Sequence, residues 1–388
     1  MNMATGIDTY IVKVASLCNL NCSYCYYYNG ADNSYRGRPK LMSPEITEVM
    51  TDKIITHAHN HGLSDVDITL HGGEPLLIDK QSFVRMMREF DRIDQAGVTT
   101  RRKCQTNAVL LDPEWIDLLT EWRIWLGISM DGPKAAHDEF RVDHAGRGSY
   151  DHTVRGLQLA LANEPNGLRT SVISVINPKH AGASMYRHLR SLGVKRMDFL
   201  LPESNYAYPP PDYEPLGPAT AYGDFLIDVF DAWIAEDDPE VLVRLLDRII
   251  RSCLGKDVQS DVIGGAPVRV AVIETDGSVE PTDNFKACAD GMTNLGLNIR
   301  HNDFDDLYNH DFFKHCIEAM QHIPSDCSGC AYLKWCAGGR ITHRYSAAEQ
   351  FAKRTIYCKD LYKLYTHVQG VVEQALGAAI PAGQSLTA

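Results

Sequence analysis

Three cysteines close together offer the clearest chemistry in this sequence. Cys18, Cys22 and Cys25 follow a C-x3-C-x2-C spacing directly after a short apolar run. A structural zinc site takes four ligands, so three thiolates on one loop do not complete one. They suit a cubane iron–sulfur cluster that is held at three corners, with its fourth iron open to a substrate or cofactor atom. Free cysteines are also common in protein cores, but unrelated core thiols would rarely show this spacing.

A second group of cysteines lies near the C-terminal end of the sequence. It has a C-x2-C-x5-C pattern and one later member, and it consists of Cys327, Cys330, Cys336 and Cys358. Four sulfurs can hold either a structural zinc or an iron–sulfur cluster, and the spacing alone leaves both open, as well as scattered core thiols. No secretory signal is visible, so the 11 cysteines indicate metal or cluster ligation rather than disulfides.

Two glycine-containing turns follow other apolar runs. In the first turn, H-G-G-E-P, Gly72 and Gly73 would let a ligand approach the backbone closely, and Glu74 adds a carboxylate. In the second turn, S-x-D-G-P, Ser129 is followed a little later by Arg141. Either segment alone could be a plain loop, so their meaning depends on the elements that carry them.

Apolar runs alternate with amphipathic stretches through the first half of the chain. The sequence predicts strands at Tyr10–Ala15, Val66–Leu70, Arg102–Asn107, Ile124–Met130, Arg169–Ile176 and Arg196–Leu201. It predicts helices at Pro44–His61, Gln81–Gln95, Glu114–Trp122 and Tyr150–Ala162. This alternation is typical of parallel β/α units. We therefore expect an α/β fold with a partial (β/α)6 barrel, whose chemistry lies on loops at the C-terminal strand ends.

The rest of the chain differs in composition. Residues 206–218 are too rich in proline for a regular element and indicate a linker or a strap over the site. Two helical stretches follow within residues 221–254, and a β-hairpin is predicted at Val268–Ile273 and Ser278–Glu280. The predicted organisation is a barrel at 1–205, a linker with bridging helices at 206–265, and a cysteine-rich domain at 266–388.

Charge and hydropathy exclude some functions. The formal net charge of −12 argues against a nucleic-acid partner, and no apolar run is long enough to span a membrane. The expected localisation is cytoplasmic. His57, His59 and His61 resemble metal ligands in spacing, but on a helix only the first and last share a face, and we expect a solvated patch.

The cysteine loop, the G-G-E-P turn and the S-x-D-G-P…R segment together resemble the radical S-adenosylmethionine (SAM) superfamily. The resemblance implies that Cys18, Cys22 and Cys25 hold a 4Fe–4S cluster whose open iron binds SAM. It also implies that the G-G-E-P turn binds the SAM amino group through Glu74. The remaining contacts to SAM that it implies come from Ser129 and Arg141, which would hold the carboxylate, and from Tyr24, which would pack near the adenine.

The second group of cysteines resembles that of SPASM-type radical SAM enzymes. The resemblance implies that these four thiols hold one auxiliary 4Fe–4S cluster, the one nearer the C-terminus. Full SPASM domains carry a second auxiliary cluster, whose pattern fails here. Thr282 and Arg340 stand where that pattern has cysteines, so we expect that site to be lost.

Finer features resemble the cyclophane-forming (FxsB-like) maturases of ribosomally made peptides. They are C-Y-Y-Y-N after the first cysteines and C-x-G-G-x3-H-R-Y after the second. The implied reaction removes a side-chain hydrogen from a precursor peptide and joins the carbon radical to an aromatic ring. Asp283 corresponds to the base of the related sulfatase maturases, although an exposed turn aspartate is an equally good interpretation.

Two other functions stay open. One is a sulfatase-maturase-like oxidation of Ser or Cys to formylglycine, and the other is a zinc-bound peptide-binding module. The expected partners of an enzyme are a precursor peptide and an external electron donor of the flavodoxin or ferredoxin type. No leader-binding domain is expected before residue 10, so the leader would be bound by the barrel mouth, the proline-rich segment or a separate protein.

Overall fold

The structure of this chain is a computed structural model. It describes residues 6–211, 213–214, 217, 219–256, 258, 260 and 268–379. The predicted proline-rich segment at 206–218 and the segment at 206–265 therefore lie partly outside the described residues.

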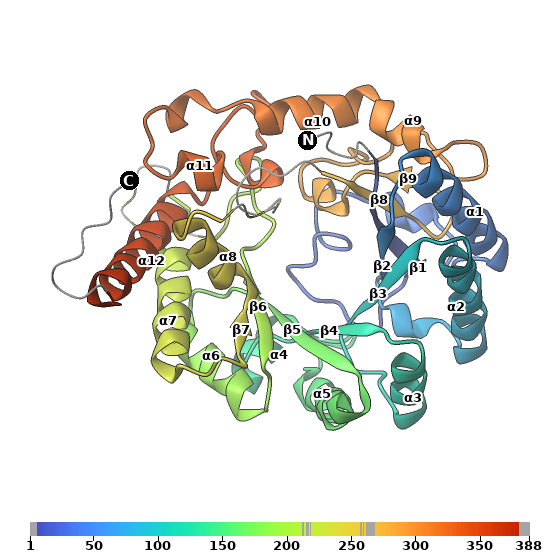
Figure 1. Cartoon of the computed structure of the whole chain (residues 1–388), viewed down its shortest axis with the longest axis horizontal. Helices are drawn as coiled ribbons and strands as arrows, with labels where there is room; N and C mark the ends of the chain where they lie inside the picture. Colours follow the sequence, from blue (N-terminus) through green and yellow to red (C-terminus); the bar gives the residue numbers. More distant parts are fainter. Residues whose placement is uncertain are drawn as a thin grey trace.

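One curved sheet organises the described part of the chain (Figure 1). It has nine strands in the order β7-β6-β5-β4-β3-β2-β1-β8-β9. All neighbours are parallel except β8 and β9, which are antiparallel. The strands are β1 (Thr9–Ala15), β2 (Asp65–Gly72), β3 (Thr99–Thr106), β4 (Trp125–Ser129), β5 (Arg169–Val175), β6 (Arg196–Leu200), β7 (Leu242–Val243), β8 (Val270–Ile273) and β9 (Val279–Glu280).

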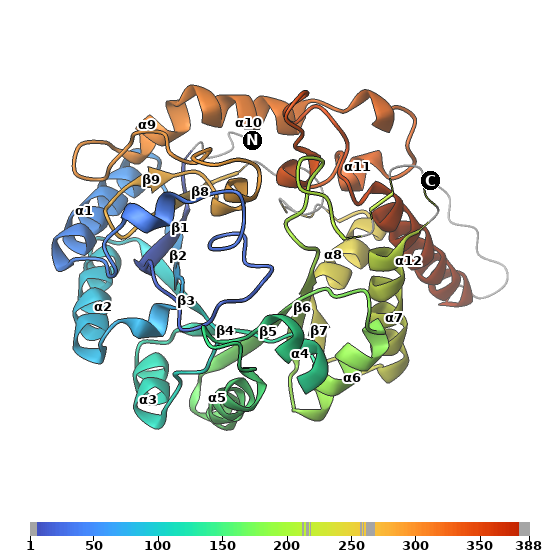
Figure 2. The same ribbon diagram turned by 180° about the vertical axis from the view of Figure 1, so that it is seen from behind.

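Helices cover the outer face of this sheet, as both views show (Figures 1 and 2). They include α1 (Pro44–Asn60), α2 (Lys80–Gln95), α3 (Pro113–Glu121), α4 (Lys134–Phe140), α5 (Tyr150–Ala162), α6 (Gly182–Ser191), α7 (Ala221–Glu236) and α8 (Arg244–Cys253). Several begin at side-chain caps that the sequence specifies. Ser43 accepts a hydrogen bond from the backbone N–H of Ile46 at the start of α1, and Asp79 caps α2 in the same way.

The predicted partial (β/α)6 barrel is confirmed. Each of the six predicted strands is present within a few residues of its predicted bounds, and so are the four predicted helices. The predicted hairpin forms as β8 and β9, but β8 also pairs in parallel with β1, with Thr9 opposite Val270. The hairpin thus extends the barrel sheet, whereas the predicted boundary at 266 grouped it with the C-terminal cysteines. Local sequence reveals a hairpin but not the distant strand it joins.

The C-terminal segment connects the two ends of the sheet (Figure 1). It contains α9 (Phe304–Asn309), α10 (Asp311–Gln321), α11 (Leu333–Cys336) and α12 (Cys358–Ala379). Helix α9 contacts α1, while α12 packs on α7 and α8 at the other end of the sheet. None of the described helices is both long and apolar enough to cross a bilayer.

A buried ion network ties the loop after β1 to the hairpin. The Arg38 guanidinium pairs with Glu274 and Glu280, and Lys286 Nζ lies 2.8 Å from Glu280 Oε2. Tyr27 donates its hydroxyl to Glu274 Oε2 at 2.9 Å. These charges are almost completely buried, so each depends on its partners for the interactions that water would otherwise supply.

Lys286→Met should therefore destabilise the protein strongly. The change removes one of the two cations, Arg38 and Lys286, that the network places beside its buried carboxylates, and breaking a buried pair typically costs about 3–5 kcal/mol. Lys53→Met removes a partly exposed lysine that pairs with Asp303, and should cost only about 0–1 kcal/mol. Urea unfolding of both variants under anaerobic conditions measures the difference. Equal loss in the two variants would show that the network does not stabilise this part of the fold.

Candidate active site

The loop that carries Cys18, Cys22 and Cys25 follows β1 and lies within the curve of the sheet (Figure 2). All three thiols are free. Burial raises the pKa of Cys18 to about 12 and that of Cys22 to about 11, and the neighbouring thiols add to the effect. Three crowded, partly buried thiols ionise poorly unless a metal supplies positive charge, so this donor set fits an iron–sulfur cluster.

The glycines of the G-G-E-P turn make room for this loop. Gly72 has a φ of +146°, and a Cβ on it would lie 2.2 Å from the carbonyl oxygen of Ala15. A Cβ on Gly73 would lie 2.0 Å from the carbonyl oxygen of Leu17 and from the Tyr28 hydroxyl. The absence of a side chain at these two positions therefore lets the cysteine loop pack directly against the turn, while a contact between the glycine backbone and a ligand stays a prediction.

Glu74 is fully enclosed at the C-terminal ends of β2 and β3. Its carboxylate accepts hydrogen bonds from Thr106 Oγ1 at 2.6 Å and from the backbone N–H groups of Asn107 and Leu76 at 2.8 and 3.1 Å. Burial nevertheless raises its pKa to about 7. A cationic group bound beside Glu74 would favour the carboxylate form, which is consistent with the predicted contact to an amino group.

Tyr24 and Arg141 meet at a third residue, Asp131. Arg141 Nε donates to Asp131 Oδ2 at 2.7 Å, and the Tyr24 hydroxyl donates to the same oxygen. The Arg141 guanidinium also lies over the Tyr24 ring, 5.4 Å from its centroid. The sequence nominated Tyr24 and Arg141 but assigned no role to Asp131, which holds both in place.

Ser129 lies at the end of β4, and Gln105 lies on the neighbouring strand, β3. Its Oγ accepts a hydrogen bond from Gln105 Nε2 at 2.8 Å. Ser129 is only partly buried, so its hydroxyl hydrogen can still be donated to a ligand.

Asp283 lies in a buried cluster at the first residue of a 3₁₀ turn (Asp283–Ala287) after the hairpin. It is 4% exposed, so the alternative of a water-exposed turn aspartate is wrong. Lys13 Nζ, from β1, donates to Asp283 Oδ2 and lies 3.2 Å from His71 Nδ1, at the end of β2. Burial alone would raise the pKa of the Asp283 carboxyl, but Lys13, His71 and Lys286 together outweigh it and hold the pKa far below its usual range.

The four C-terminal cysteines line one small cavity. Its walls also include Leu333, Gly338, Arg354 and Thr355. Burial raises the pKa of Cys336 to about 12, and the other three thiols of the group add to the effect because they lie close by. Four converging free thiols fit a metal or cluster, and the structure does not distinguish zinc from iron–sulfur.

A polar network joins the two positions, Thr282 and Arg340, at which the predicted second auxiliary pattern lacks its cysteines. Thr282 Oγ1 donates to Asn284 Oδ1 at 2.9 Å, and Arg340 NH2 donates to the same oxygen at 3.1 Å. Arg340 also pairs with Glu203, which accepts from Asn284 Nδ2 at 2.8 Å. Thr282 and Arg340 are therefore neighbours in space that share Asn284 as a hydrogen-bond acceptor.

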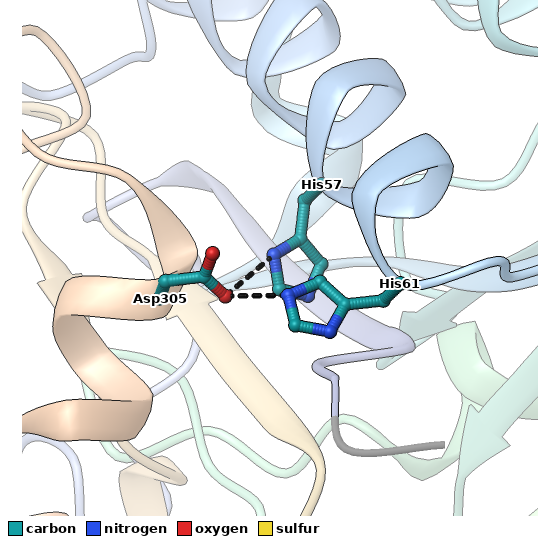
Figure 3. A group of neighbouring side chains, drawn as sticks. All are labelled: His57, His61 and Asp305. Atoms are coloured by element: carbon teal, nitrogen blue, oxygen red, sulfur yellow. Dashed lines mark hydrogen bonds and ion pairs between the residues drawn. The ribbon is translucent and has the colours of Figure 1, made fainter.

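Of the three histidines at the end of α1, His59 is exposed, but His57 and His61 do not form the solvated patch that the sequence suggested. His57 is 4% exposed, and Figure 3 shows His57 and His61 directed at Asp305 of α9. His57 Nδ1 and His61 Nε2 lie 3.2 and 2.7 Å from Asp305 Oδ1. The backbone N–H of Ile7 donates to His57 Nε2 at 2.9 Å, so Nδ1 carries the ring hydrogen and has no lone pair for a metal. These residues are a hydrogen-bonded contact between α1 and α9.

Comparison with known proteins agrees with this geometry. Residues 12–190 match the model of the radical SAM superfamily. This part of the chain is a radical SAM domain. The chain is accordingly an enzyme that contains this domain, and its cofactors include SAM and a 4Fe–4S cluster.

Relatives resemble nearly the whole chain. A cysteine-type anaerobic sulfatase-maturating enzyme of Clostridium perfringens is 26% identical, over 92% of this chain and 95% of the relative. A serine-type anaerobic sulfatase-maturating enzyme of Bacteroides thetaiotaomicron is also 26% identical, over 92% and 88%. No comparison points specifically to the cyclophane-forming group.

Two solved structures share the fold. Native anSMEcpe with bound AdoMet has a TM-score of 0.79 and 22% identity, over 95% of this chain and 99% of that chain. Streptococcus suis SuiB bound to the precursor peptide SuiA has a TM-score of 0.56 and 15% identity, over 91% and 76%.

Sequence reasoning missed Lys13, His71 and Asp131. Lys13 lies in an apolar strand, and nothing in its neighbourhood in the sequence indicates a partner 270 residues away. A lysine inside an otherwise apolar strand could have served as a signal, because buried lysines are rare unless paired.

Iron content should distinguish the possible metal sites. Two cubanes predict about eight irons per chain after anaerobic reconstitution, and about four when Cys18, Cys22 and Cys25 are all changed to Ala. The same triple variant should form no 5′-deoxyadenosine from SAM. About four irons with one zinc in the wild type would make the C-terminal group a zinc site, and about twelve irons would mean a further cluster.

Proposed function

We propose that this radical SAM enzyme oxidises a side chain in a peptide or protein substrate. One observation carries the proposal: a buried carboxylate, Asp283, lies beside the cysteine loop inside the barrel, paired with Lys13. A binding module would need no such group next to a radical-generating site. The similarity of the whole chain to sulfatase-maturating enzymes supports a peptidic substrate.

In this proposal each site residue has one role. Cys18, Cys22 and Cys25 are the ligands of the SAM-binding cluster. The C-terminal group holds one auxiliary 4Fe–4S cluster, with Cys327, Cys330, Cys336 and Cys358 as its ligands. The contacts to SAM come from Tyr24, Gly72, Gly73, Glu74, Ser129 and Arg141.

The bound cofactors supply the 5′-deoxyadenosyl radical, which removes a hydrogen atom from the substrate. The chain's own residues orient the partners of that step. Asp131 aligns the Arg141 guanidinium for a charge-assisted contact with the SAM carboxylate, and Glu74 faces the amino group. Asp283 accepts the proton that the substrate radical loses, and Lys13 keeps Asp283 ionised. The auxiliary cluster, when bound, would accept the remaining electron.

The first candidate outcome is oxidation of Cys or Ser to formylglycine. The names of the cysteine-type and serine-type relatives favour it over the cyclophane reaction that the sequence suggested. Serine would lose two hydrogens. Cysteine would lose two hydrogens as well and then exchange its sulfur for the oxygen of water.

A second candidate outcome, cross-linking of a side-chain carbon to an aromatic ring, has its own support. The sulfatase-maturase pattern has thiolates where this chain has Thr282 and Arg340. These positions form a hydrogen-bonded network with Asn284, so an electron acceptor used by that chemistry would be missing here. SuiB, which was solved with a precursor peptide, shares the fold.

A peptide partner fits either outcome. An external one-electron donor of the flavodoxin or ferredoxin type is part of the proposal because the cluster must be reduced for each radical. Recognition of a leader sequence by the barrel mouth or by a separate protein is a proposal of the same kind.

Peptide mass spectrometry should separate the two outcomes. The Cp18Cys and Kp18Cys peptides, which anSMEcpe binds, serve as cysteine-containing probes, with their Cys→Ala versions as controls. We expect exchange of sulfur for oxygen with loss of two hydrogens at cysteine. A loss of two hydrogens from an aromatic-containing peptide without Cys or Ser, with fragments that stay joined, would favour the cross-link. No change in any peptide while SAM is cleaved would contradict a peptide-oxidising function.

Asp283→Asn should separate radical formation from product formation. The amide cannot accept the proton, so 5′-deoxyadenosine should still form while product falls by about 10²–10⁴-fold. Asp303→Asn changes an exposed aspartate that pairs with Lys53 and serves as the control. Unchanged product formation by Asp283→Asn would remove Asp283 from the mechanism.

A further inference from the structure

Lys13 is buried among groups from three other segments. Its ammonium, on β1, is paired with Asp283 and lies 3.2 Å from His71 Nδ1. It also lies 4.9 Å from the centroid of the Tyr27 ring, on the cysteine loop. The Lys13 side chain is 1% exposed, so its charge acts on these neighbours with little screening by water.

His71 fixes the direction of this ammonium. The backbone N–H of Gly72, at 2.9 Å, and the Lys13 ammonium, at 3.2 Å, share the single lone pair of His71 Nδ1, which assigns the ring hydrogen to Nε2. Burial, and then Lys13, lower the pKa of His71 to about 4, so the ring stays neutral near pH 7. His71 therefore accepts from Lys13 without adding a second positive charge.

We propose that Lys13, oriented by His71, is a positioning residue that holds Asp283 as a carboxylate and places one positive charge beside the cysteine loop. The first part rests on the proposed function of Asp283 as the proton acceptor. The second part does not, because it concerns the cluster and not the substrate. Lys13 itself needs no contact with substrate for either effect.

The pH dependence follows from the groups around Asp283. Lys13 of β1, His71 of β2, Lys286 of its own turn and Tyr26 of the cysteine loop face it. An opposite charge typically lowers a carboxyl pKa by about 1–3 units, so Lys13→Met should raise it by that amount. Product formation needs Asp283 as a carboxylate. It is therefore retained at pH values above this pKa and lost as the pH falls below it. The variant should therefore lose product at a pH about 1–3 units higher than the wild type.

The first experiment needs no peptide. Loss of a nearby cation disfavours the added electron, so Lys13→Met should shift the midpoint potential of the SAM-responsive cluster to more negative values. An EPR-monitored redox titration of the reconstituted enzyme measures this shift. Lys13→Arg keeps the charge and should restore the potential, and Lys53→Met, at a partly exposed pair, should not change it. An unchanged potential in Lys13→Met would overturn the effect on the cluster.

The second experiment measures pH profiles of Cp18Cys conversion and of 5′-deoxyadenosine formation. Lys13→Met should shift the acid limb of the conversion profile and leave the profile of 5′-deoxyadenosine formation unchanged. Lys13→Arg should restore the wild-type acid limb. The same acid limb in wild type and Lys13→Met would overturn the role of Lys13 toward Asp283. If the wild type converts no peptide, the proposed function fails, while the redox titration still decides whether Lys13 acts on the cluster.

A folding defect is resolved by a double variant. Lys13→Met alone leaves the buried Asp283 charge without its partner, whereas Lys13→Met with Asp283→Asn makes both positions neutral. Recovery of folding in the double variant supports a role of Lys13 toward Asp283. Failure of both variants to fold would make Lys13 a structural residue and overturn the proposal.

Discussion

Burial of charge between the cysteine loop and the β8–β9 hairpin is the constraint on which the rest of the site depends. Arg38 comes from the loop segment, Glu274 and Glu280 from the hairpin, and Lys286 from the turn that begins at Asp283. Removing one partner would leave the others charged in an interior that cannot solvate them. The loop and the turn are therefore held in one fixed relation, although more than 240 residues separate them.

The same constraint explains why the candidate base and the cysteine loop meet. The hairpin adds to the sheet through β1, the strand that carries Lys13 and leads into the loop. Lys13 then contacts Asp283 directly, and Tyr27 of the loop contacts both Lys13 and the hairpin. On the other side of the site, a backbone N–H at the end of β3 holds the Glu74 carboxylate, and Asp131 holds the Arg141 guanidinium. Glu74 and Arg141 are the groups that would contact SAM. Positioning by rigid strands suits a reaction that must direct a reactive radical to one hydrogen.

The C-terminal segment adds a second centre by a different construction. Two of its four thiols come from a 3₁₀ turn and the loop after it, and the other two from the last residue of α11 and the first residue of α12; all four line one cavity. Arg344 is buried nearby and donates to the carbonyl oxygens of Lys353 and His322. These hydrogen bonds stabilise the irregular backbone around the cavity. Thr282, Asn284, Arg340 and Glu203 form a network of hydrogen bonds and an ion pair nearby. These contacts give the polar groups of that region their partners.

The sequence alone determined the barrel, its six strands and the two groups of cysteines, because helix caps, apolar alternation and ligand spacing are local properties. It also located Glu74, Arg141 and Asp283. It did not reveal that β8 would pair with β1, or that His57 would be buried against Asp305, since no local pattern encodes a partner far away in the chain. Likewise, only tertiary structure brought Lys13 and His71 to Asp283. The charge and orientation of the candidate base are thus decided by packing and not by the residues next to it in sequence.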